Sequence, residues 1–331
     1  MNSFKALVVD KTETDFTVAI QTISIEDLPE GDVTIQVLYS SINYKDGLAC
    51  IPNGKIVNSY PFIPGIDLAG IVISSKDPRF KEGDEVIATS YEIGVSHYGG
   101  YGQYARLCGD WIIPLPKGLT LKEAMVLGTA GLTAALSIHR LEENGLSPEK
   151  GKVLVTGATG GVGSVAVAML AKRNYHVVAS TGKESEHTYL YGLGAKEVVS
   201  RHDVYSEPIR PLDKQTWAAA VDPVGGKTLA AVLSKIQYGG AVAVSGLTGG
   251  TDVPTSVFPF ILRGVQLLGI DSVYCPMELR KLIWERMAND LKPTQLLQSI
   301  AREITLEQLP SALSAILKGQ LRGRTIVKLT S

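Results

Sequence analysis

Cysteine is scarce in this sequence, and neither sign of charge is in excess. The 331 residues include three widely separated cysteines, Cys50, Cys108 and Cys275. This spacing excludes a four-cysteine zinc lobe and argues against the disulfide framework of a secreted protein. With 32 basic and 33 acidic residues, the net charge is −1. We therefore expect neither a nucleic-acid partner nor a membrane partner.

An apolar signal core is also lacking, because charged residues are scattered through the first fifteen positions. We therefore expect a cytoplasmic protein. One uncharged stretch, residues 153–171, approaches the length of a membrane span. Several glycines interrupt its first half, so it predicts a buried strand, a turn and a buried helix instead.

Apolar residues and glycine are what the chain has in quantity. Hydrophobic residues make up 45% of the sequence, and 34 residues are glycine. At about 150 residues per domain, the length predicts two domains, and the apolar fraction is sufficient for two cores.

The pattern of predicted elements changes along the chain. In the first third, short β-branched runs predict strands over residues 4–10, 33–41, 68–74 and 85–89. From about residue 121 onward, predicted helices and strands alternate, which indicates βαβ units and a parallel sheet. The predicted helices include 121–144, 184–193 and 306–318. A final strand over 324–329 can return to the first sheet, so the β domain is expected to be discontinuous.

The most informative segment is a glycine-rich turn between a predicted strand at 152–156 and an apolar helix. Gly157, Gly160 and Gly163 have the spacing G-x-x-G-x-x-G. Such glycines let backbone N–H groups approach a pyrophosphate at the positive end of a helix. We therefore expect dinucleotide contacts from Thr159, Gly160, Gly161, Val162 and Gly163.

The coenzyme is predicted from the end of the next strand. An acidic residue there usually holds the ribose of NAD, but this chain has Ser180, Thr181, Gly182 and Lys183. Hydroxyl groups and an ammonium suit a 2′-phosphate, which favours NADPH over NADH. Arg201, after the third strand, can add a second cation; the alternative for both cations is a solvated surface position.

The same glycines also fit the short-chain dehydrogenases, which begin with their nucleotide motif and use a Tyr-x-x-x-Lys pair. Here the motif starts near residue 156, and no tyrosine has a lysine four positions later. We therefore exclude that class.

The chain resembles the medium-chain dehydrogenase/reductase superfamily. Residues 43–46, 60–70 and 83–86 are similar to its N-terminal markers, and 160–164 resembles the quinone oxidoreductase branch. Five further segments resemble the YhdH/YhfP group, which includes acrylyl-CoA reductases: 41–46, 180–183, 259–263, 269–273 and 323–327.

The resemblance implies an α/β fold with two domains. We expect a GroES-like, mainly β catalytic domain over 1–124, completed by about 295–331. A Rossmann NADPH-binding domain with a doubly wound parallel sheet is expected over 125–294. The resemblance also implies a homodimer that pairs through the edge strand at 265–270, because an exposed apolar edge needs cover.

Zinc alcohol dehydrogenases differ from this chain at their ligand positions. They carry Gly-His-Glu where this chain has Gly65, Ile66 and Asp67, and a catalytic cysteine where it has 43–46. Ile66 cannot ligate a metal, so we expect no metal ion and a zinc-independent reductase. Asp67 is expected to bond backbone N–H groups.

The predicted reaction is NADPH-dependent reduction of a C=C bond conjugated to a carbonyl, as in acrylyl-CoA. Tyr44 is the first candidate to contact the nicotinamide or supply a proton, and Asn43 and Lys45 are candidate donors to the developing charge. Two alternatives stay open: reduction of a quinone, and a non-catalytic NADPH-binding redox sensor.

Further cofactor contacts are expected from the sheet topology. Gly246 and Leu247 follow the fifth strand, and Ile270 and Asp271 follow the sixth. Other candidate contacts are Thr133, near a helix start, and Arg322 and Arg324, which can reach the site if the last strand returns to the β domain.

Overall fold

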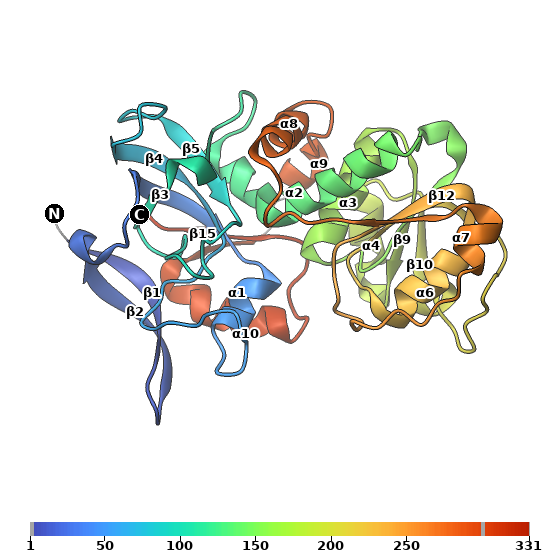
Figure 1. The fold of residues 1–331 in the computed structure, drawn as a ribbon, viewed down its shortest axis with the longest axis horizontal. Coiled ribbons are helices and arrows are strands. Elements are labelled where there is room, and N and C mark those ends of the chain that lie inside the picture. Colours follow the sequence, from blue (N-terminus) through green and yellow to red (C-terminus); the bar gives the residue numbers. More distant parts are fainter. Residues whose placement is uncertain (1–2, 299–301, 331) are drawn as a thin grey trace. The chain divides into compact units, whose positions relative to one another are not determined.

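The computed structural model describes residues 3–298 and 302–330, and these form two compact units (Figure 1). The first unit comprises Met1–Thr129, Val273–Leu282 and Ile300–Ser331, and the second comprises Ala130–Ser272 and Ile283–Ser299. The domain limits inferred from the sequence stay a prediction.

The first unit is built mainly of antiparallel β structure. Within the described residues, a seven-stranded sheet has the order β14-β15-β3-β4-β5-β7, with β6 on β3, and β1 and β2 form a separate ribbon. The strands are β1 Ser3–Lys11, β2 Phe16–Ser24, β3 Val33–Ser41, β4 Asp67–Ser75, β5 Glu85–Thr89, β6 Tyr104–Leu107, β7 Ile112–Pro114, β14 Arg302–Thr305 and β15 Thr325–Lys328. The pairing of β15 with β3 confirms that the last strand returns to the first sheet.

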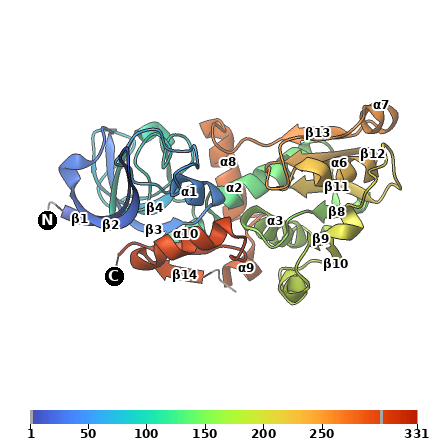
Figure 2. The same ribbon diagram turned by 90° about the horizontal axis from the view of Figure 1, so that it is seen from below.

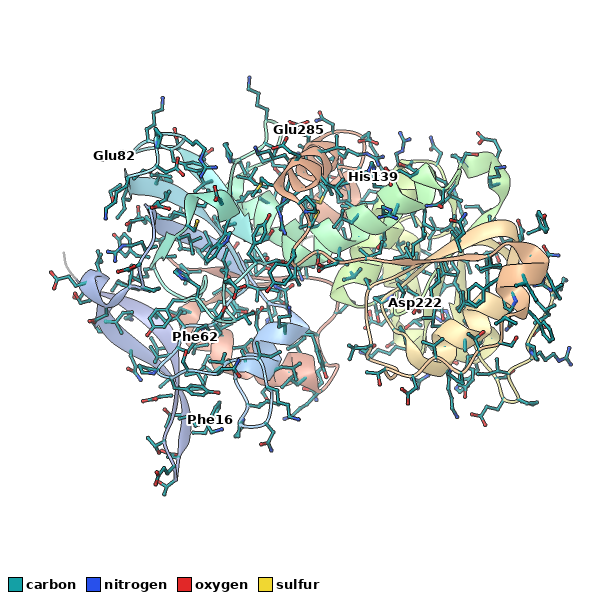
Figure 3. The ribbon with its side chains drawn as sticks, viewed as in Figure 1. Phe16, Phe62, Glu82, His139, Asp222 and Glu285 are labelled. Carbon is teal, nitrogen blue, oxygen red and sulfur yellow. The ribbon has the colours of Figure 1, made fainter. Side chains whose placement is uncertain are left out.

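Side chains from several strands fill the core of the first unit. Leu7, Ile35 and Leu107 are fully buried there, and Phe62, labelled in Figure 3, packs in a smaller neighbouring cluster. Burial of such apolar surface is the main favourable contribution to folding. It fixes the strand register on which the candidate site depends.

Two helices of the first unit lie side by side, as Figures 1 and 2 show. They are α1 Tyr44–Ala49 and α10 Leu309–Leu317. Their approach is close at Gly47, where an added Cβ would lie 2.9 Å from Cγ of Leu317. The sequence pattern predicts α10 but not α1, which has only six residues.

The second unit contains the predicted parallel sheet. In the described residues its six strands have the order β10-β9-β8-β11-β12-β13, and all neighbouring pairs are parallel. The strands are β8 Lys152–Val155, β9 His176–Thr181, β10 Glu197–Ser200, β11 Trp217–Asp222, β12 Ile236–Val244 and β13 Gln266–Gly269. The order reverses between β8 and β11, so this is a doubly wound sheet with its switch point at the glycine-rich turn.

Helices follow the strands of the second unit. They are α3 Gly161–Lys172, α4 His187–Gly192, α5 Arg201–Val204, α6 Gly226–Lys235, α7 Phe258–Arg263 and α9 Thr294–Gln298, and α8 Met277–Ala288 belongs to both units. A single helix was predicted over 184–193. The structure has a 3-10 turn, Glu184–Glu186, before the shorter helix α4.

Helix α2, Leu121–Glu143, is interrupted where the sequence predicted a continuous helix. Gly128 has φ +52° and ψ −155°, a backbone conformation that breaks the helical path and that side chains disfavour. By length and composition α2 could cross a membrane, but 83% of its most apolar window is buried, as in the core helix of a folded protein. The cytoplasmic location stays a prediction.

Candidate functional site

The turn between β8 and α3 forms a tight cradle of backbone. Gly157 has φ +52°, and a Cβ added at Gly163 would overlap the carbonyl oxygen of Gly157. Gly160 precedes α3 and supplies no side-chain cap. The first N–H groups of a helix have no intrahelical acceptor, so this uncapped end suits an anion such as a pyrophosphate.

The end of β9 lies beside this cradle. The N–H of Ala158 donates to the carbonyl of Ser180 at 3.1 Å, which ties the turn to the strand. The side chains of Ser180 and Thr181 are buried, whereas Gly182 and Lys183 are exposed. No carboxylate occupies the strand end itself.

Arg201 lies close to this strand end. It begins α5, and a Cβ added at Gly182 would lie 2.8 Å from its Nε. The structure therefore brings Gly182 and Arg201 together, with Lys183 next in the chain. A guanidinium and hydroxyl groups at one strand end suit a phosphate.

The carboxyl ends of β11 and β12 add further polar groups. Asp222 is buried; its carboxylate accepts from the Thr156 hydroxyl and, at 2.8 Å, from the N–H of Gly225. Burial raises the pKa of this carboxyl. Ser245 follows β12, and its buried Oγ has no hydrogen-bond partner among the described residues. A polar ligand at this edge of the sheet would supply the missing hydrogen-bond partner.

The remaining predicted contacts of the second unit lie on several segments. Gly246 and Ile270 are half-buried, while Leu247 and Asp271 are exposed. Thr133 is buried, and its hydroxyl donates to Oγ of Ser272 at 2.9 Å. The cradle, the β9 end and the orphaned Ser245 thus fit a phosphorylated dinucleotide.

In the interior of the first unit, a cluster of polar side chains surrounds Asp67, the first residue of β4. Its fully buried carboxylate accepts from the Ser41 hydroxyl at 2.5 Å and from Nδ2 of Asn43 at 2.8 Å. It also accepts from Thr129, whose N–H lies 3.0 Å from Oδ2 and whose hydroxyl lies 2.5 Å from Oδ1. The expectation that Asp67 bonds a backbone N–H is confirmed at Thr129.

Arg324, just before β15, is buried beside the same carboxylate. Its Nη1 lies 3.3 Å from Oδ1 of Asn43, its Nη2 lies 2.8 Å from Oγ of Ser41, and its Nε donates to the carbonyl of Val126. Nη2 is 4.0 Å from Oδ2 of Asp67. The Asn43 amide is therefore held from both sides, by an acceptor and by a cation. Arg322, by contrast, is exposed.

Asp46 fixes the backbone of the same segment. Its carboxylate accepts from the N–H of Asn43 at 2.8 Å and from the N–H of Ile66 at 2.9 Å. Complete burial, reinforced by the charge of Asp67, raises the pKa of Asp46 to about 7. Burial and the charge of Asp46 also raise the pKa of the Cys50 thiol to about 12.

Tyr44 and Lys45 follow this fixed segment at the start of α1. Tyr44 is 46% exposed, and Lys45 is half-buried. The structure thus groups Asn43, Tyr44 and Lys45 with Arg324 in one unit. The glycine cradle, Ser180, Thr181 and Arg201 lie in the other.

Sequence reasoning missed several members of the Asp67 cluster, namely Ser41, Asp46, Thr129 and the link to Arg324. One signal was available, because Asn43 and Asp46 have the spacing of a helix capping box. Among the residues that the structure describes, no group of three His, Cys, Asp or Glu side chains could hold a metal ion.

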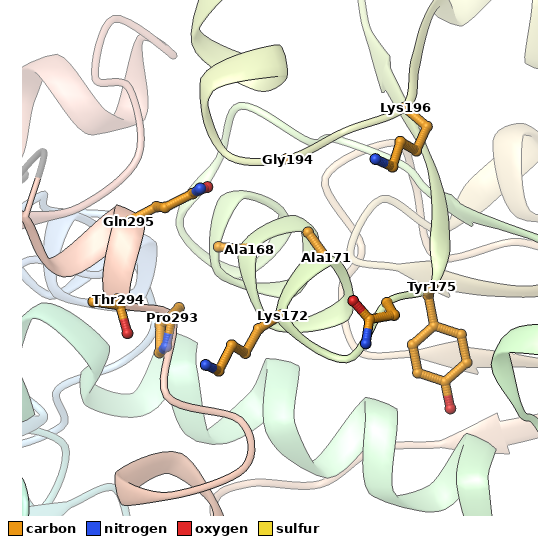
Figure 4. Close-up of a pocket in the computed structure, with 10 residues that line it drawn as sticks. Ala168, Ala171, Lys172, Tyr175, Gly194, Lys196, Pro293, Thr294 and Gln295 are labelled. Atoms are coloured by element: carbon orange, nitrogen blue, oxygen red, sulfur yellow. The ribbon is translucent and has the colours of Figure 1, made fainter.

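A separate hollow of about 660 Å³ lies at the opposite end of α3 from the glycine cradle. Figure 4 shows Lys172, Tyr175, Lys196 and Gln295 among its lining residues. It contains none of the predicted site residues. At this end of α3 the helix dipole is negative, which a lysine offsets.

Comparisons with known proteins cover nearly the whole chain. The alcohol dehydrogenase GroES-like domain matches residues 29–117, and the zinc-binding dehydrogenase family matches residues 161–289. These matches, together with the two units described above, confirm the predicted fold class: a Rossmann sheet plus a GroES-like, mainly β domain.

Three bacterial proteins are especially similar. YhfP of Bacillus subtilis is named a putative quinone oxidoreductase. It is 65% identical to this chain over 98% of this chain and 99% of YhfP. Its crystal structure with NAD bound has a TM-score of 0.97, at 64% identity over 99% of this chain and 100% of that one. The acrylyl-CoA reductase AcuI of Ruegeria pomeroyi is 50% identical over 98% of both chains. The yhdH oxidoreductase of Salmonella enterica in complex with NADP has a TM-score of 0.95, at 47% identity over 98% of this chain and 100% of that one.

Proposed function

Because this chain belongs to the quinone oxidoreductase-like branch of the zinc-independent medium-chain dehydrogenases/reductases, we propose that it is an NADPH-dependent reductase of acrylyl-CoA-type enoyl thioesters. The observation that carries the substrate assignment is the 50% identity to the acrylyl-CoA reductase AcuI over 98% of this chain. The coenzyme assignment has independent support in the residues of the second unit.

These residues fit NADPH in two places. The uncapped N–H groups at the start of α3 would hold the pyrophosphate, with contacts from residues 159–163. Ser180, Thr181, Lys183 and Arg201 would hold the 2′-phosphate. The yhdH structure contains NADP and the YhfP structure contains NAD, so our assignment of NADPH rests on these side chains. When bound, NADPH supplies a hydride.

The side chains of the first unit account for the other half of the reduction. Adding hydride to the β-carbon of an enoyl thioester places negative charge on the thioester oxygen, and the α-carbon then takes a proton. The hydroxyl of the exposed Tyr44 is our proton donor, and the Lys45 ammonium is a donor to the developing oxyanion. The Asn43 amide is already engaged by Asp67 and Arg324, so it positions Tyr44.

An NADPH oxidation screen tests this function. We expect consumption of NADPH with acrylyl-CoA, and slower consumption with crotonyl-CoA, small enones and quinones. Tyr44→Phe should lower kcat for acrylyl-CoA by about 10²-fold, the usual contribution of a general acid, and leave NADPH binding unchanged. Full activity of Tyr44→Phe would remove Tyr44 from the proposal.

Quinone reduction is the second candidate function, because the name of YhfP at 65% identity favours it. A quinone also accepts a hydride and a proton, and it needs no thioester oxygen site. Consumption of NADPH with quinones alone would select this function. Tight NADPH binding without turnover of any acceptor would select a redox sensor.

We also propose a homodimer that forms through the second unit. Strand β13 is the last strand of its sheet, and the neighbouring α7 exposes Phe258 (44%), Ile261 (68%) and Leu262 (56%). An open strand edge beside a contiguous apolar surface favours association. Ile261→Glu should give a monomer by light scattering. The control Tyr191→Glu, at an apolar residue 52% exposed on α4, should stay dimeric; a monomeric native protein would contradict the proposal.

A further inference from the structure

Positive charge is concentrated around α1, although the chain as a whole has a net charge of −1. The segment 44–60, which holds α1 and the loop after it, contains Lys45 and Lys55. The segment 309–324, which holds α10 and its following loop, contains Lys318, Arg322 and Arg324. The two segments together contain one acidic residue, Asp46, which is completely buried.

The fold of the first unit places Lys55 and Lys318 on segments that contact α1. Gly47 of α1 packs against Leu317, so Lys318 follows directly at the α1–α10 contact. The loop after α1 folds back onto the helix, because a Cβ added at Gly54 would overlap the carbonyl oxygen of Leu48. Lys55 therefore lies in the loop folded onto α1, and Lys318 lies at the end of α10, the helix that contacts α1; we refer to Lys55 and Lys318 as the lysine cluster.

The charges of the lysine cluster are not neutralised. Lys55 and Lys318 are exposed, and neither ammonium group forms an ion pair with a residue that the structure describes. Some lysines of the chain do have a counter-ion, such as Lys122, whose ammonium lies 2.6 Å from the carboxylate of Glu303. Exposed ammonium groups without a counter-ion attract an anionic ligand.

Apolar surface adjoins the lysine cluster. Ile51 in the loop after α1 is 36% exposed, and Tyr44 on the helix itself is 46% exposed. A ligand that matches this surface has several negative charges at one end and an uncharged arm that reaches Tyr44. The phosphorylated end of a coenzyme A thioester has these properties, because the pantetheine arm separates three phosphate groups from the reactive acyl group.

We propose that the lysine cluster binds the 3′-phospho-ADP part of coenzyme A thioesters. This inference rests on the proposed function and adds to it a binding surface remote from the reacting carbons. Binding energy from such a non-reacting part of a substrate lowers KM and helps to orient the acyl group.

The test compares acrylyl-CoA with acrylyl-pantetheine, which has the same arm and thioester but no nucleotide. The variants are Lys55→Glu, Lys318→Glu and the double variant, with the exposed Lys117→Glu as a matched control. We expect the double variant to raise KM for acrylyl-CoA about tenfold, which corresponds to about 1.4 kcal/mol. KM for acrylyl-pantetheine, KM for NADPH and kcat should stay unchanged, and Lys117→Glu should match the native protein.

Three results would overturn the inference. The first is an equal KM of the native protein for acrylyl-CoA and acrylyl-pantetheine. The second is an unchanged KM for acrylyl-CoA in the double variant. The third is a rise in KM for NADPH instead, which would assign the cluster to the coenzyme. With any of these three results, reduction of the thioesters would still support the proposed function. If the native protein reduced neither thioester, the proposed function itself would be wrong.

Discussion

Asn43 and Asp67 are joined by a 2.8 Å hydrogen bond from the amide Nδ2 of one to the carboxylate Oδ2 of the other. Asn43 precedes α1 and Asp67 begins β4, so this bond fixes the helix start against the sheet. Arg324 holds the other end of the same amide. The orientation of Tyr44, the next residue, depends on this arrangement.

Asp67→Asn should destabilise the first unit and slow the reaction. An amide cannot accept from all the donors around Asp67, and it leaves the Arg324 guanidinium buried without its counter-charge. Breaking a buried charge pair in this way costs about 3–5 kcal/mol, measured by urea unfolding. The fraction of the variant that remains folded should have a lower kcat, whereas its KM for NADPH should be unchanged.

A surface carboxylate provides the control for this prediction. Asp110 pairs with Arg79 at 2.7 Å, but its side chain is 74% exposed. Asp110→Asn should therefore change the free energy of unfolding by less than about 1 kcal/mol. Equal effects of the two substitutions would contradict the role given to Asp67.

Asp46 should make stability fall as the pH rises through the neutral range. Its pKa is raised from an ordinary value of 3.8 to about 7, so between these values the folded state binds a proton that the unfolded state has lost. The free energy of unfolding then decreases from about pH 4 to about pH 7 and becomes level above that range. Urea unfolding across this range should show a steeper decline for the native protein than for Asp46→Asn, and identical slopes would contradict the assignment.

Gly163→Ala should abolish NADPH binding. The added Cβ overlaps the carbonyl oxygen of Gly157, so the cradle must open, at a cost of about 1–3 kcal/mol for overpacking. Gly192→Ala is the matched control, because an added Cβ there meets nothing within 4 Å. Calorimetry should show NADPH binding to Gly192→Ala but not to Gly163→Ala; normal binding by Gly163→Ala would mean that the coenzyme does not use the cradle.

Lys183→Glu and Arg201→Glu should raise KM for NADPH far more than KM for NADH. A carboxylate repels the 2′-phosphate that only NADPH carries, whereas the ribose hydroxyls of NADH tolerate it. The two constants are measured in the same variant, so NADH serves as the internal control. Equal changes in both constants, or a native protein that uses NADH as well as NADPH, would contradict the 2′-phosphate assignment.

Features determined by neighbouring residues could be predicted from the sequence. The glycine cradle lies between a strand and a helix that follow each other in the chain, and the alternation of strands and helices predicts the parallel sheet. Helix α1 could not be found in this way, because its six residues are too few for a periodic pattern. The hairpin strand β2 was also missed, since each of its side chains is half-buried or exposed.

The cluster around Asp67 could not be predicted from the sequence, for a different reason. Ser41, Asp67, Thr129 and Arg324 are distant in the chain, and only the return of β15 to β3 brings the arginine to the carboxylate. The break at Gly128 has the same origin. A Cβ at this glycine would lie 2.5 Å from the Asp67 carboxylate, so its backbone conformation depends on a tertiary contact.

The most direct test follows the transferred hydrogen. Acrylyl-CoA is incubated with the purified protein and NADPH that carries deuterium at C4 of the nicotinamide, and the propionyl-CoA formed is analysed by mass spectrometry and NMR. We expect one deuterium at the β-carbon of the product and a solvent-derived proton at the α-carbon. Propionyl-CoA without the label, or no propionyl-CoA while NADPH is consumed with quinones, would contradict hydride transfer to an enoyl thioester.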